Sequence, residues 1–179
     1  EPEEVAEILR PLKPKLRGPV RMVSIDLISG ESGDTLWLET PAGVPFIPLN
    51  DGWLVFLWPQ GGKRGTSDSR YAVGSLNTKT RAGGWVGSKE EYLPLADAIA
   101  YAEQSIPAAG FTIPKSRATW RRGNQAPSEA QVRVARSLGI AGWEDMTKAR
   151  LSDEISVAFA TRALDQHMQP DPGVDIAGQ

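Results

Sequence analysis

Few side chains in this sequence are of the types that form a catalytic or metal centre. The 179 residues include no cysteine and a single histidine, His167, next to a segment rich in proline and glycine. These two counts argue against thiol catalysis, disulfides and the usual transition-metal sites. Asp153 and Glu154 are neighbours in a predicted helix, so their carboxylates point in different directions and do not form an acid–base pair. No Gly-x-x-x-x-Gly-Lys-Ser/Thr phosphate loop occurs, and we expect no cofactor in this segment.

The cationic side chains are a stronger signal, because they are unevenly distributed. The net charge is only −2. Residues 1–59 carry nine acids and five bases, whereas residues 60–89 carry six bases, and residues 115–136 carry another six with one acid. A local excess of cations attracts polyanions even where the total charge is near zero. Nucleic acid is therefore the ligand class that this pattern favours.

Three groups of cations are candidate phosphate contacts. The first lies in a predicted loop and turn near Tyr71 and Trp85, and single-strand binders combine such cations with stacking rings. The second surrounds Trp120 in a predicted linker, and the third lies on a predicted helix pair, whose N-termini also attract anions. For each group the alternative is an ordinary solvated surface, with the aromatic rings in the core. The candidate nucleic-acid-binding residues are Lys63, Arg64, Arg70, Lys79, Arg81, Lys115, Arg117, Trp120, Arg121, Arg122, Arg133, Arg136, Lys148 and Arg150.

The spacing of apolar residues predicts a sheet in the first half of the chain. A period of two begins at residue 20, and residues 53–58 are apolar on both faces, as in a central strand; together with the turns between them these segments predict an antiparallel sheet of about five strands. The sequence Asn-Asp-Gly at 50–52 predicts a hairpin turn. Pro45 and Pro48 predict an edge strand or an irregular segment over 44–49. The predicted strands are 23–27, 36–40, 44–49, 53–58, 71–76 and a short one at 85–86.

Helices are predicted after the sheet. A helical period over 93–105, with Pro94 in the first turn and Pro107 after the end, gives an α+β domain over 20–106. Ser128 and Gln131 form a capping box for the first helix of a small C-terminal pair. Its end is marked by Gly139, and Thr147 starts the second helix, whose predicted apolar stripe is Leu151, Ile155, Ala158, Phe159 and Ala163. The predicted units are 1–19 (linker with a short helix), 20–106 (sheet and helix), 107–127 (basic linker), 128–166 (helix pair) and 167–179 (disordered tail).

Several short segments carry a resemblance to a known family. They are 128–131 (Ser-Glu-Ala-Gln), 135–140 (Ala-Arg-Ser-Leu-Gly-Ile), 146–148, 151–155, and upstream 71–74, 83–86 and 98–103. Residues 20–165 resemble the C-terminal accessory region of actinobacterial and phage superfamily 2 (DEAD/DEAH-type) DNA helicases, and the helix pair is similar to a SAP-type helix-extended-helix DNA-binding unit. The resemblance implies an ATP-dependent motor outside this chain and an accessory grip on DNA, as a single strand or a fork. None of the motor motifs occurs here, so no catalytic residue is carried over.

Two other interpretations remain open. A protein-interaction module would present Trp37, Trp120 or Trp143 as an exposed anchor. A small enzyme would bring distant carboxylates together around Mg²⁺. No apolar run approaches the roughly 20 residues of a membrane span, and the lack of cysteine fits the cytoplasm. The chain opens with Glu1-Pro2 rather than Met, from which we expect a segment of a longer protein.

Overall fold

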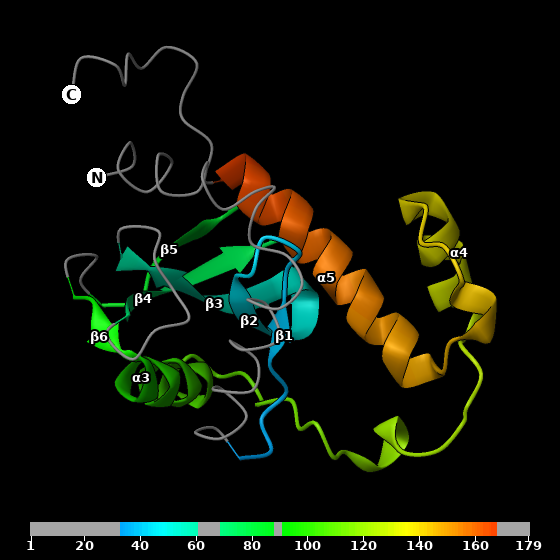
Figure 1. Ribbon diagram of the computed structural model, residues 1–179, viewed down its shortest axis with the longest axis horizontal. Helices are drawn as coiled ribbons and strands as arrows, with labels where there is room; N and C mark the ends of the chain where they lie inside the picture. Colours follow the sequence, from blue (N-terminus) through cyan, green and yellow to red (C-terminus); the bar gives the residue numbers. More distant parts are fainter. Residues whose placement is uncertain (1–32, 61–68, 88–90, 168–179) are drawn as a thin grey trace.

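The described part of the chain is one sheet with a long helix on each face (Figure 1). In this computed structural model the described residues are 33–60, 69–87 and 91–167. The predicted strand at 23–27, the predicted helix within 1–19 and the predicted tail after residue 167 lie outside these ranges. The class predicted from the sequence, α+β with an antiparallel sheet, is confirmed.

All strand pairs in the sheet are antiparallel, and the described residues contribute six strands. Five of them follow the order β1-β2-β3-β4-β5, and β6 pairs with the first residues of β4, beside the stretch that β5 covers. β6 was not predicted, because two residues before a helix carry no recognisable period. The strands are β1 (Leu38–Glu39), β2 (Pro45–Pro48), β3 (Trp53–Pro59), β4 (Arg70–Asn77), β5 (Gly83–Trp85) and β6 (Leu93–Pro94).

β2 departs from the prediction that its prolines place it at an edge or make it irregular. It lies between β1 and β3, with Phe46 opposite Leu38 on one side and opposite Phe56 on the other. Pro45 and Pro48 are the first and last residues of the strand, where the missing N–H disturbs the hydrogen-bonding ladder least. A proline therefore limits the length of this strand without forcing it to the edge.

β3 and β4 form the centre of the sheet, and their close contact depends on one glycine. Phe56 pairs with Gly74 across the two strands. A Cβ atom at Gly74 would lie 2.3 Å from Cζ of the Phe56 ring, so the ring occupies the space of the missing side chain. Side chains along β3 alternate between faces, which gives the sheet one apolar core on each side.

Helix α3 (Leu95–Ala108) covers one face of the sheet and contributes Ala98, Ile99, Ala102 and Ile106 to the core. The helix is longer than predicted, because Pro107 lies in its last turn and not after its end. Pro94 precedes the helix as its N-cap. Proline has no backbone N–H to donate, and this is tolerated best in the first turn of a helix. Pro107 lies in the last turn instead, and α3 ends one residue after it.

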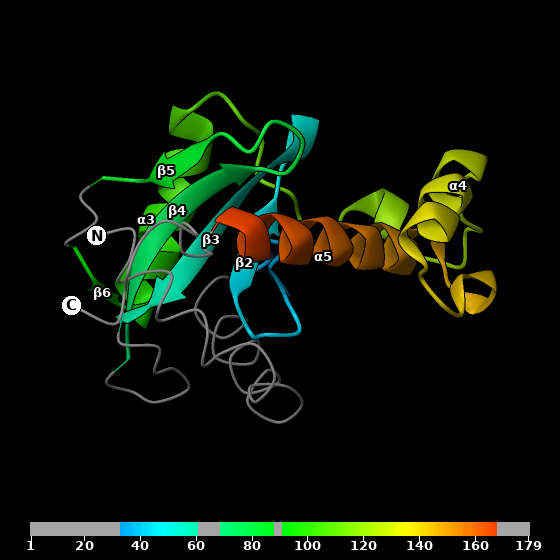
Figure 2. The same cartoon turned by 90° about the horizontal axis from the view of Figure 1, so that it is seen from above.

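The opposite face is covered by the C-terminal half of helix α5 (Lys148–His167). Ala160, Ala163 and Leu164 pack on Phe56 and Trp58, both of which are buried. Burying each large apolar side chain contributes about 1.5–3 kcal/mol, so this helix is part of the sheet domain and not only of a separate helix pair. Figure 2 shows the N-terminal half of α5 extending away from the sheet toward α4.

The predicted helix pair is present at that distal end. α4 (Glu129–Leu138) starts with the predicted capping box, in which Ser128 and Gln131 bond reciprocally at 3.2 and 2.9 Å. Gly139 ends the helix in the left-handed region with φ 70°, as its sequence position predicts. The hydroxyl of Thr147 accepts the backbone N–H of Arg150 at 3.2 Å and so caps α5.

The stretch predicted as a basic linker forms backbone hydrogen bonds with the segment before β1 and contacts α5. Leu36 N–H donates to the Pro114 carbonyl at 2.8 Å, and Ser116 N–H donates to the Asp34 carbonyl at 2.7 Å. Further on, the 3-10 helix η4 (Thr119–Arg121) contacts α5. The sheet and the helix pair are therefore joined through both this stretch and α5.

Candidate nucleic-acid interface

A groove of about 410 Å³ opens at the end of the sheet where the β2–β3 turn, the β4–β5 turn and α5 meet. Phe46 and Leu54 from the sheet line it, and so do three cations, Lys79, Arg81 and Arg162. Among the described residues no carboxylate lines this groove. We refer to it as the cationic groove. An anion entering it meets three positive side chains and no lining carboxylate.

The β4–β5 turn that supplies two of the cations is organised by Asn77, a buried residue at the end of β4. Its side-chain Oδ1 accepts the backbone N–H groups of Lys79 and Thr80 at 2.9 and 3.0 Å, which is an Asx-type turn. Its Nδ2 donates to the Asp51 carbonyl at 3.1 Å, in the neighbouring β2–β3 turn. One amide group therefore connects the two turns that form this side of the groove.

The backbone conformation of Arg81 is unusual for a residue with a side chain. Its φ is 66°, in the left-handed region, and its N–H donates to the Asn77 carbonyl at 2.9 Å. The Nη1 atom of its guanidinium is shielded from solvent and has no hydrogen-bond partner among the described residues. An unsatisfied buried donor of this kind has a free energy cost.

α5 supplies the third cation, Arg162, from beside the residues that pack on the sheet. Ser156, Phe159 and Arg162 follow one another at intervals of three residues, so they share one side of the helix, and all three line the groove. The Phe159 ring is 37% exposed, although the sequence predicted it in the apolar stripe that faces the core. Of the predicted stripe, Leu151 and Ala163 are buried, and the α5 residues in the core cluster on the sheet are Ala160, Ala163 and Leu164.

Of the fourteen residues predicted from the sequence, the structure brings Lys79 and Arg81 together at this groove. Arg162 and Phe159 were missed, and so was Trp53, which lines the groove from the start of β3. No local signal identifies Arg162, since its role depends on how α5 packs. Asn77 could have been found, because Asn followed by Thr-Lys-Thr is a typical turn sequence.

Other predicted cations are engaged elsewhere. Both guanidinium Nη atoms of Arg121 bond the carboxylate of Asp153, at 2.9 and 2.5 Å, and the Arg121 side chain is only 11% exposed. Lys115 forms an exposed ion pair with Asp34 at 3.1 Å. Arg121 is thus paired with a carboxylate that lies far along the sequence.

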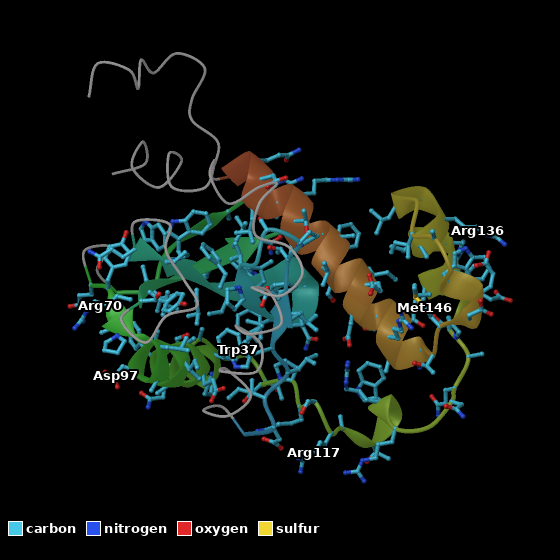
Figure 3. All side chains as sticks on the ribbon, viewed as in Figure 1. Trp37, Arg70, Asp97, Arg117, Arg136 and Met146 are labelled. Atoms are coloured by element: carbon cyan, nitrogen blue, oxygen red, sulfur yellow. The ribbon has the colours of Figure 1, made fainter. Side chains whose placement is uncertain are left out.

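The remaining cations do not form one continuous face. Figure 3 places Arg70, Arg117 and Arg136 at three separate edges of the molecule. Arg70 donates to the Tyr92 carbonyl at 3.3 Å, and Arg136 lies over the Trp143 ring, 5.1 Å from its centroid. Exposed cations without a shared groove include Arg117, Arg122, Arg133 and Arg150, while Lys148 is partly buried and Lys63 and Arg64 lie outside the described residues.

The aromatic residues also differ from expectation. Tyr71, predicted as a possible stacking ring, is buried in the α3 core, and Trp85 packs on Phe56 with ring centroids 6.0 Å apart. Trp37 was considered as an exposed anchor, but it is buried and its Nε1 donates to Glu103 at 3.1 Å. Trp120 is 44% exposed beside the Arg121 guanidinium.

Two further observations concern metal binding and membrane insertion in the described residues. No cluster of three or more His, Cys, Asp or Glu residues there could hold a metal ion. No helix there has the length and apolar character needed to cross a membrane. Comparison with known proteins adds no family: no protein-family model, curated protein or solved structure matches the chain.

Proposed function

We propose that this chain binds nucleic acid, with the sugar–phosphate backbone lying in the cationic groove. The observation that carries the proposal is the convergence of Lys79, Arg81 and Arg162 on a groove that no described carboxylate lines. The exposed ring of Phe159 and the half-buried ring of Trp53 stand in the same groove. Cations that follow a backbone, together with rings that stack on bases, are the usual parts of a single-strand site.

On this proposal the chain is an accessory region of a larger cytoplasmic protein that processes DNA, such as a superfamily 2 DNA helicase. The groove would hold a DNA single strand or fork beside a motor that supplies the ATP-dependent step. The packing of α5 on both the sheet and α4 supports a rigid adaptor, because one helix joins the two parts. A rigid connection would keep bound DNA in a fixed direction relative to any neighbouring domain.

The proposal is tested by fluorescence anisotropy of a labelled single-stranded oligonucleotide, titrated at several salt concentrations. Each phosphate neutralised on a single strand lowers the slope of log K against log salt by about 0.7. Three contacts therefore predict a slope of about −2. Absence of binding at low salt, or binding that does not change with salt, would contradict it.

A protein-interaction module is the second candidate, and one observation favours it. Trp120 exposes 44% of its surface on η4 beside Arg121, and tryptophan and arginine are both enriched in protein interfaces relative to the rest of the surface. This alternative predicts that Trp120→Ala abolishes capture of a protein partner while leaving oligonucleotide binding unchanged. Partner binding would then tolerate high salt, because its main contribution is apolar.

A further inference from the structure

A second cavity, of about 320 Å³, lies on the other face of the sheet beside the cationic groove. It is lined mainly by apolar side chains, among them Val55, Val86 and Ile106, together with the hydroxyl-bearing residues Ser75 and Ser105. The aromatic rings of Trp53 and Phe111 also line it, with centroids 6.5 Å apart and planes inclined at 63°. We refer to it as the apolar pocket.

The two cavities share part of their walls. Leu49, Trp53 and Leu54 line both the cationic groove and the apolar pocket. These residues flank and begin β3 at the β2–β3 turn, so the two cavities adjoin at this end of the sheet. The groove offers cations, whereas the pocket offers flat apolar walls with few polar groups.

A ligand that fits both cavities must have an anionic part next to a flat, weakly polar part. We propose that the ligand is single-stranded DNA, with one unstacked base in the apolar pocket while the adjoining phosphates lie in the cationic groove. This inference rests on the proposed function and specifies that the bound nucleic acid is single-stranded and not a duplex. A base in a duplex is stacked and paired, and it enters a pocket only after unstacking. The pocket therefore selects single strands, and the groove alone does not.

The first test uses the unmodified protein and two oligonucleotides of equal length and charge. One carries normal bases, and the other carries abasic sugar residues through its central positions. Base–aromatic contacts of this kind contribute about tenfold or more to affinity. We expect the abasic strand and a duplex each to bind at least tenfold more weakly than the normal strand. Equal binding of the normal and abasic strands would overturn the pocket assignment while leaving the backbone groove in place. Binding of none of the three would contradict the proposed function itself.

The second test fills the pocket from α3. Ser105→Leu adds a branched side chain at a residue that lines the pocket, and Gln104→Leu adds the same side chain at its exposed neighbour as the matched control. We expect Ser105→Leu to reduce affinity for the normal strand about tenfold and to leave the abasic strand unaffected. Thermal unfolding of both variants checks that each remains folded. A loss of equal size in the two variants, or for the two strands, would overturn the inference.

Discussion

Asn77 accepts the backbone N–H of Lys79 through its side-chain oxygen at 2.9 Å, and this bond sets the shape of the turn that holds two of the three groove cations. The same amide reaches the β2–β3 turn through its donor group, at the Asp51 carbonyl. Because Asn77 is 4% exposed, these bonds are largely protected from competing water. The position of the cations therefore follows from a buried polar residue and not from the cations themselves.

Replacing Asn77 with alanine is expected to weaken both stability and binding. The change removes two acceptor bonds and one donor bond to backbone groups of the two turns, and each such bond contributes about 0.5–1.5 kcal/mol. Urea unfolding measures the stability, and anisotropy measures binding of the single strand. Thr80→Ala removes only the bond from Ala82 N–H to the Thr80 hydroxyl and is the milder control. Unchanged affinity for Asn77→Ala would show that the turn does not position the cations.

The ion pair between Arg121 and Asp153 is expected to stabilise the junction of η4 with α5. Its bidentate geometry and limited exposure, 11% and 26% for the two side chains, predict a coupling energy of about 1 kcal/mol or more in a double-mutant cycle. The exposed pair of Lys115 and Asp34 should give about 0–0.5 kcal/mol in the same measurement. Equal coupling in the two cycles would contradict this difference.

The contact between Phe56 and Gly74 predicts a large effect of a single methyl group. Gly74→Ala would place a carbon 2.3 Å from the Phe56 ring, so the ring or the strands must move, and overpacking of this kind costs about 1–3 kcal/mol or more. Gly84→Ala on the adjacent strand meets no heavy atom within 4 Å and serves as the control. Calorimetric melting should show a large decrease for the first variant and little change for the second.

A substitution in the capping box of α4 is expected to lower stability without changing the affinity for nucleic acid. Ser128→Ala removes the side-chain acceptor for Gln131 N–H, which costs about 1 kcal/mol of stability. None of the described residues that line the groove belongs to α4, so affinity for a single strand should not change in conditions where the variant is folded. A loss of affinity in this folded variant would mean that α4 takes part in the nucleic-acid interface.

Local sequence signals were sufficient for elements whose cause is local. The continuous apolar run of β3, the capping box at Ser128 and the left-handed Gly139 depend on residues within one turn or one strand. The α+β class followed from the change of period between residues 20–86 and the later helices. β1 and β6 are only two residues long, and a segment of two residues has no period that fixes its bounds.

The site could be predicted only in part, because it is assembled from distant segments. Lys79 and Arg81 were identified from a basic turn, but Arg162 reaches the groove only because α5 packs across the sheet. For the same reason Arg121, which has the sequence character of a phosphate contact, is engaged by Asp153. The sequence contains the cations, and tertiary packing decides which of them are available.

The most direct test of the nucleic-acid groove compares two arginine-to-glutamine substitutions on the same helix, each of which removes one positive charge. Arg162→Gln removes a groove cation, and Arg150→Gln removes an exposed cation near the start of α5, outside the groove. We predict that Arg162→Gln reduces affinity for a single-stranded oligonucleotide about five- to tenfold and makes the salt slope smaller by about 0.7, because one phosphate contact is lost. Arg150→Gln should bind nearly as the unmodified protein does. Equal losses in both variants, or no loss in Arg162→Gln, would contradict the cationic groove as the binding site.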